Sequence, residues 1–136
     1  MTPLRLAILL TLVLLTGCLP TGAYTSDFKK NGDLFVAAMR WKDVQTAALF
    51  VAPEQRNALL EAFAANDDLN IVDVQFEQFA PGDEKGRAET VLVMEYYLLP
   101  SATVKKWRWQ QQWQQLDSET KQQKPWQIVN APPPFP

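Results

Sequence analysis

The sequence predicts an α+β domain in which N-terminal helices pack on one face of a curved antiparallel sheet of about four strands. Three observations predict this class. Apolar residues between positions 33 and 65 recur at helical spacing, and those between 72 and 129 alternate with polar residues as they do in strands. A Pro- and Gly-containing loop at 81–86, a turn at Pro100-Ser101 and a polar loop through Lys121 and Lys124 separate the strand-like segments, which is typical of antiparallel connections.

The helical part divides into three segments. Asp33 can cap the first helix, and Asp43 can cap a second segment that runs to Val51, so the sequence allows one bent helix or two. Pro53 occupies a first helical position of the last segment, which ends at residues 66–68. The residues expected to face the core are Leu34, Phe35, Ala38, Met39 and Trp41, then Val44, Ala47, Ala48 and Val51, then Leu59, Leu60 and Phe63.

Four strand-like segments follow. A hairpin loop at 81–86 joins the first to a strand at 87–99, which is apolar on both faces at its centre and is therefore expected in the middle of the sheet. A long strand at 104–116 and a short one at 126–129 complete the series. The predicted core residues are Val72, Val74 and Phe76 in the first strand, Trp107, Trp109 and Trp113 in the third, and Trp126 and Ile128 in the last; Asp73, Gln75, Glu77, Lys106, Arg108, Gln110, Gln112 and Gln114 are expected on the opposite face.

The N-terminal segment has the pattern of an export signal. Arg5 precedes an apolar run at 6–15, which is about half the roughly 20 residues that a membrane-spanning helix needs. The run ends in Leu15-Thr16-Gly17-Cys18, which resembles the lipobox of bacterial lipoproteins. The resemblance implies cleavage before Cys18, a diacylglyceryl group on its thiol, palmitate-type acylation and anchoring in a membrane through the acyl chains. The alternative is an ordinary signal peptide with a chance cysteine.

This interpretation divides the chain into a lipoprotein signal peptide at 1–17, a lipidated tether at 18–26, an α+β domain at 27–130 and a Pro-rich tail at 131–136 that is expected to be extended. The expected location is the cell envelope. Leu19 is not the aspartate associated with inner-membrane retention, so in a Gram-negative source the periplasmic face of the outer membrane is favoured.

Composition excludes several function classes. The chain has no histidine, and Cys18 is its single cysteine, which acylation would consume. Ser-His-Asp catalysis, Cys-His catalysis and histidine-containing metal sites are thereby excluded, and we expect no cofactor and no enzyme activity. Removal of 1–17 takes Arg5 away and moves the formal net charge from −2 to −3, so nucleic acid is not an expected partner.

The order of helices followed by a meander, with the segments 37–43 and Trp126-Gln127-Ile128, resembles the cone-shaped superfamily of nuclear transport factor two, ketosteroid isomerase and the SnoaL-like proteins. The resemblance covers most of 26–130. The chain departs from it by having no clear strand between the helices, which leaves a simpler cystatin-like layout open. An isomerase-type site would combine Tyr96 or Tyr97 with Glu95 or Asp73; the favoured alternative is that these are sheet-edge tyrosines and solvated carboxylates.

The tryptophan-rich strand has two interpretations. Trp107, Trp109 and Trp113, with Trp126 and Tyr96 nearby, could form an aromatic platform for a glycan or an apolar ligand, but a core role is favoured. The basic residues at 105–108 are expected to be solvated, with anionic lipid headgroups as the alternative contact. The glutamine-rich face of the strand is the expected surface for a homodimer or an envelope protein partner. The favoured function is therefore binding or scaffolding, and the alternatives are an isomerase-type enzyme and a glycan-binding module.

Overall fold

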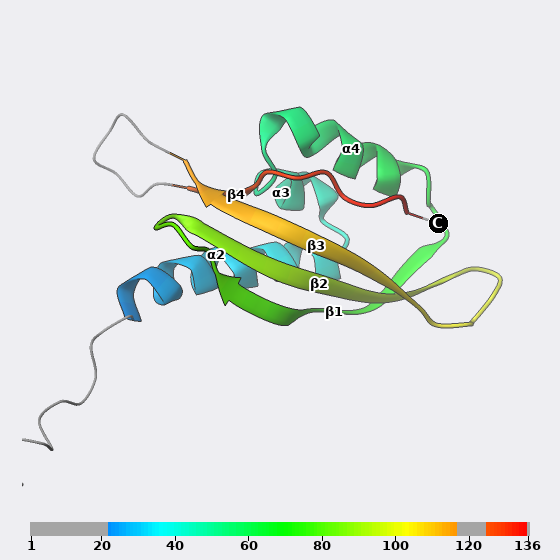
Figure 1. Cartoon of the computed structure of the whole chain (residues 1–136). Coiled ribbons are helices and arrows are strands. Elements are labelled where there is room, and N and C mark those ends of the chain that lie inside the picture. The colour runs from blue at the N-terminus through cyan, green and yellow to red at the C-terminus, as the bar shows by residue number, and fades with distance from the viewer. Residues whose placement is uncertain (1–21, 117–124, 136) are drawn as a thin grey trace, which may run out of the picture.

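The computed structural model of the chain describes residues 22–116 and 125–135. Within these residues, three helices precede four strands that form one antiparallel sheet in the order β1-β2-β3-β4. The helices pack on one face of the sheet (Figure 1), so the predicted α+β class is confirmed. The elements are α2 (Gly22–Arg40), α3 (Val44–Ala48), α4 (Pro53–Ala64), β1 (Leu69–Pro81), β2 (Arg87–Leu98), β3 (Lys105–Gln115) and β4 (Trp126–Ile128).

Helix α2 begins at Gly22, so the predicted start at Asp33 is wrong. Asp33 lies inside the helix, where its carboxylate forms an exposed ion pair with Lys29 one turn earlier, at 2.6 Å. Residues four apart face each other on a helix surface, so this pair supports the helix that Asp33 was expected to start. The segment at 22–26, placed in the tether by the sequence, belongs to α2.

The inner side of α2 also differs from the predicted stripe. Three of the five predicted core residues are buried, but Leu34 is 52% exposed and Trp41 is 81% exposed. The longer helix adds Phe28 to the buried side, seven residues before the buried Phe35. Seven residues make about two turns, so these two phenylalanines define one line along the helix. Leu34 and Trp41 form a neighbouring line that is left facing solvent.

Two further helices connect α2 to the sheet. Lys42 has a positive φ of 57°, which ends α2, and the Asp43 Oδ1 atom accepts the backbone N–H of Thr46 at 3.1 Å to cap α3. The sequence allowed either one bent helix or two in this region, and the structure has two separate helices. Pro53 starts α4 as predicted. The buried residues of these two helices are Ala47, Ala48, Leu59 and Phe63.

Strand β1 is irregular. Its register against β2 shifts between Ile71 and Asp73, and again between Phe76 and Gln78. Val72 has no Cα partner at the first shift and is 51% exposed, whereas Val74 is fully buried. The prediction of Val72 as a core residue is wrong because a β-bulge adds one residue and changes which side chains face the core.

Strands β2 and β3 follow the sequence pattern closely. Strand β2 lies between β1 and β3, as its apolar centre predicted, with Leu92, Val93 and Met94 all buried. The hairpin loop falls between Pro81 and Arg87, and its Gly86 has a φ of 87° that favours glycine. Along β3 the three tryptophans are buried and the predicted outward residues are exposed or half-buried, so the predicted alternation is confirmed.

The two edges of the sheet are protected differently. At the β4 edge, the backbone of Ile128 exchanges two hydrogen bonds of 2.8 Å with the segment at 50–52. Beyond β4, the side chain of Asn130 accepts the Gln112 N–H and donates to the Gln110 carbonyl, both at 2.7 Å, and so continues the pairing of β3. Backbone groups at this edge are thereby satisfied without a long strand.

At the β1 edge, side chains take the place of a neighbouring strand. Arg40 donates to the Val74 carbonyl at 2.6 Å and pairs with the Asp73 carboxylate at 3.0 Å. Lys42 donates to the Leu69 carbonyl at 3.1 Å. The cations at the end of α2 thus hold the helix against this edge.

The C-terminal segment returns to the domain. It has no regular secondary structure over 131–135 and runs beside α4 (Figure 1). Its Phe135 ring stacks on Phe63 at a centroid distance of 5.3 Å and lies 5.1 Å from Tyr96 and 5.8 Å from Trp107. Residue 135 therefore covers one end of the core.

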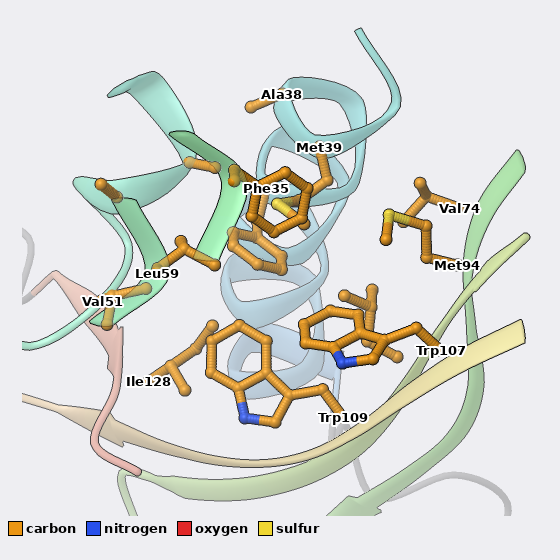
Figure 2. Close-up of a cluster of buried hydrophobic side chains, with 14 of the residues drawn as sticks. Phe35, Ala38, Met39, Val51, Leu59, Val74, Met94, Trp107, Trp109 and Ile128 are labelled. Atoms are coloured by element: carbon orange, nitrogen blue, oxygen red, sulfur yellow. The ribbon is translucent and has the colours of Figure 1, made fainter. Parts of the chain in front are cut away.

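The core fills the space between the sheet and the helices. Figure 2 shows Trp107 and Trp109 projecting from β3 into this space, with Leu59 approaching from α4. The Phe35 ring of α2 meets Trp109 and Trp113 at centroid distances of 6.2 and 5.6 Å, in edge-on arrangements that aromatic pairs favour.

Candidate functional site

The predicted lipidation site, Cys18, lies outside the described residues. The part of the structure nearest to it in sequence is the start of α2, four residues beyond Cys18 at Gly22. Within residues 22–116 and 125–135, no helix is both long and apolar enough to cross a bilayer.

The predicted aromatic ligand site lies in the core. Trp107, Trp109 and Trp113 are 5%, 1% and 1% exposed, and Tyr96 is 2% exposed. Their rings pack against phenylalanines of α2, α4 and the C-terminal segment rather than facing solvent. A sugar needs an open ring face for stacking, so these rings could receive one only after the core had repacked.

A buried polar network interrupts the tryptophan row. Thr90 of β2 donates to the Gln111 Oε1 atom at 2.9 Å and accepts the Trp113 indole N–H at 2.9 Å. Thr90 and Gln111 are 1% and 0% exposed. The network links β2 and β3 inside the core, where each hydrogen bond replaces one that water would otherwise provide.

Other donors in the same region have no partner among the described residues. These are the indole N–H groups of Trp107 and Trp109 and the Gln111 Nε2 atom, all fully buried. A buried donor without an acceptor opposes folding, so the apolar packing of this region must offset that cost.

The structure places Tyr96 and Glu95 of the hypothetical isomerase site on opposite faces of β2, with the half-buried Tyr97 on the same face as Glu95. Tyr96 points into the core, and Glu95, its neighbour on β2, points to the opposite face and pairs with Lys106 at 2.8 Å. Asp73 is held by Arg40 at 3.0 Å. Burial raises the pKa of the Tyr96 hydroxyl, which disfavours its ionised form. Asp73 lies opposite Glu95 in the pairing of β1 with β2, so both carboxylates belong to strand positions other than the one that faces Tyr96.

Two ion pairs lie on the outer face of the sheet. The Arg108 guanidinium donates to both oxygens of Glu77, at 2.9 and 3.2 Å, and Lys106 pairs with Glu95. The hydrogen bond from Arg108 holds the pKa of the Glu77 carboxyl below its usual value, and the same contact raises the pKa of Arg108. These two cations are neutralised within the sheet, which weakens their predicted role toward anionic headgroups.

A shallow apolar groove lies between α2 and β1. Phe28, Phe76 and Phe79 line it, with Lys29 and Asp33 at its rim. The Phe28 and Phe79 rings stack at a centroid distance of 5.1 Å, and Phe79 remains 43% exposed. The helix comes close to the strand here because Gly32 has no side chain: a Cβ atom at that position would lie 2.9 Å from the Phe76 ring.

Comparisons with family models, with characterised proteins and with solved structures give no match. Within the described residues, no group of three or more acidic, histidine or cysteine side chains is arranged to hold a metal ion.

Three features of these sites were not predicted from the sequence. Gln111 lies on the same side of β3 as the tryptophans, and the spacing of two from Trp109 and Trp113 could have identified it as a buried polar residue. Phe28 precedes Phe35 by seven residues, which is the spacing that marks the true inner side of α2. The contact of Phe135 with the core has no comparable local signal, because it joins residues far apart in sequence.

Proposed function

We propose that the protein is a lipid-anchored cell-envelope protein whose α+β domain binds or scaffolds other components rather than catalysing a reaction. The observation that carries the proposal is Leu15-Thr16-Gly17-Cys18 at the end of an apolar run that follows Arg5. Two or more acyl chains give a stable anchor, since each buried methylene contributes about 0.8 kcal/mol.

The arrangement of the domain supports a role without catalysis. The interior between helices and sheet is filled by large aromatic side chains. Tyr96, which has the raised pKa, faces this interior, whereas Glu95 faces the opposite side of the sheet. A proton-transfer site needs a base within hydrogen-bond reach of the reacting group, and this pair does not provide one.

The test is the intact mass and membrane fractionation of the full chain expressed in a bacterium. We expect a mass that lacks residues 1–17 and includes acyl chains, with the protein extracted from membranes by detergent and not by high salt. Cys18→Ser should remain unacylated and lose this behaviour. A wild-type protein that is cleaved elsewhere and carries no acyl group would refute the anchor.

A matched control separates the position of the thiol from its presence. The double variant Cys18→Ser/Thr21→Cys keeps one cysteine but moves it three residues beyond the lipobox. We expect it to behave as Cys18→Ser does. Acylation of the displaced cysteine would show that the four-residue pattern does not direct the modification.

A further inference from the structure

The solvent side of α2 carries an apolar line that no described element covers. Leu34 is 52% exposed, Trp41 is 81% exposed, and Ala37 between them is exposed as well. The three are spaced as i, i+3 and i+7, which places them on one side of a helix. Trp41 follows the last residue of α2, but its N–H still donates to the Ala37 carbonyl at 3.1 Å, so it continues the helical surface.

Trp41 differs from every other tryptophan of the chain. The remaining four are between 1% and 5% exposed and belong to the core. A tryptophan that faces solvent on an apolar helix line is a feature of membrane interfaces, where the ring sits at headgroup depth with its N–H directed to water. Lys30 lies one turn before Leu34 on the same side, is exposed, and has no ion-pair partner within the described residues.

The short distance in sequence between Cys18 and α2 would keep this apolar line close to the bilayer if Cys18 carries acyl chains. Cys18 and Gly22, where α2 begins, are four residues apart, and four extended residues span at most about 14 Å. The 19 residues of α2 are about 28 Å long at 1.5 Å per residue. An acyl chain on Cys18 therefore holds the start of α2 close to the bilayer, within reach of a helix that lies along it.

We propose that α2 lies on the lipid surface, with Leu34, Ala37 and Trp41 inserted at headgroup depth and Lys30 directed to anionic headgroups. This inference rests on the proposed acylation of Cys18. It orients the domain: α2 is between the bilayer and the sheet, so the outer face that carries Arg108 and Glu77 points away from the membrane, toward soluble or envelope partners.

The exposure pattern gives a direct test by fluorescence. The acylated full chain is reconstituted in vesicles of phosphatidylethanolamine and phosphatidylglycerol that contain doxyl-labelled phosphatidylcholine. We expect the doxyl lipids to quench part of the tryptophan emission, and Trp41→Phe to remove most of that quenchable part. Acrylamide should quench Trp41 several-fold less in vesicles than in the unacylated Cys18→Ser protein.

A second variant tests the contribution of the rest of the apolar line while Trp41, whose fluorescence is measured, stays unchanged. Leu34→Glu places a charge at headgroup depth and should reduce the doxyl quenching of Trp41 several-fold, with the fold retained in circular dichroism because Leu34 is exposed. Val104→Glu is the matched control, since Val104 is equally exposed at 52% and lies between β2 and β3, outside the helix. It should leave the quenching unchanged.

Three outcomes would overturn the inference. Acylated protein whose Trp41 is open to acrylamide and insensitive to doxyl lipid overturns the inference and leaves the anchor intact. Trp41 that is shielded from acrylamide yet insensitive to doxyl lipid assigns the line to a protein contact instead. Intact mass without acyl chains removes the tether, and so overturns the proposed anchor together with the inference.

Discussion

The two faces of the sheet are made by the same strands and are stabilised in different ways. On the inner face, Trp109 and its neighbours are removed from water and pack against α2. On the outer face, Arg108 and Glu77 remain about half exposed and interact mainly with each other. Apolar burial in a packed interior contributes far more than an exposed ion pair. The inner face therefore sets the stability of the domain, while the outer face can change with little effect on folding.

The largest expected effect comes from the inner face. Trp109→Ala should lower the free energy of unfolding by about 3–5 kcal/mol, because it removes a buried indole and leaves a cavity. Urea denaturation followed by circular dichroism measures this loss. Gln110→Ala, the exposed neighbour on β3, is the control and should change the midpoint little. Equal effects of the two variants would contradict the assignment of the faces.

The buried network should give the next largest effect. Thr90→Val leaves the Trp113 indole N–H without its acceptor and should cost about 1–3 kcal/mol of unfolding free energy. Thr90→Ser keeps the hydroxyl and should recover most of the loss in the same urea experiment. A Thr90→Val protein as stable as the wild type would show that the network contributes nothing net.

Burial of Tyr96 predicts a loss of stability at alkaline pH. Its pKa is raised in the folded state, so folding favours the protonated phenol, and this contribution is complete below the pKa of about 10 of an unfolded tyrosine. It is lost as the pH rises from there through the folded pKa. Above pH 9, the melting temperature of Tyr96→Phe should therefore fall less steeply with rising pH than that of the wild type. Thermal denaturation over this pH range measures the difference, and Tyr97→Phe is the matched control. Parallel curves for wild type and Tyr96→Phe would refute the link.

The smallest effect is expected on the outer face. Arg108→Gln removes the hydrogen bond that lowers the Glu77 pKa, so that pKa should rise toward the usual glutamate value. Carbon-13 NMR titration of the Glu77 carboxyl measures the change. Lys106→Gln is the comparison: Lys106 pairs with Glu95 and lowers the Glu77 pKa less than Arg108 does, so this variant should raise that pKa less. The depressed pKa favours folding above the unfolded pKa and loses this effect on acidification, so Arg108→Gln should only slightly reduce the pH dependence in the acid range.

Much of the fold followed from local pattern. The alternation in β3 was correct at every tryptophan, since a strand has only two faces and a period of two assigns them without ambiguity. Pro53 and Asp43 marked helix starts correctly, because both act on the backbone next to them. The inner side of α2 was assigned partly wrong, since a helix can rotate continuously and Leu34 and Trp41 are as apolar as the residues that are buried.

The candidate sites divide in the same way. The resemblance of Leu15-Thr16-Gly17-Cys18 to a lipobox rests on a local pattern that the sequence alone provides. Whether Trp107, Trp109 and Trp113 form core or binding surface depended on which elements pack over them. The exposure of Val72 depended on a bulge that the sequence pattern of β1 does not indicate.

The sequence by itself determined the element types, the central place of β2 and the two faces of β3, because each is governed by interactions between residues close in the chain. Only the tertiary structure decided which line of α2 meets the sheet, how Asn130 closes an edge and where Phe135 packs. These depend on contacts between distant segments, whose free energy is realised only when the whole core assembles.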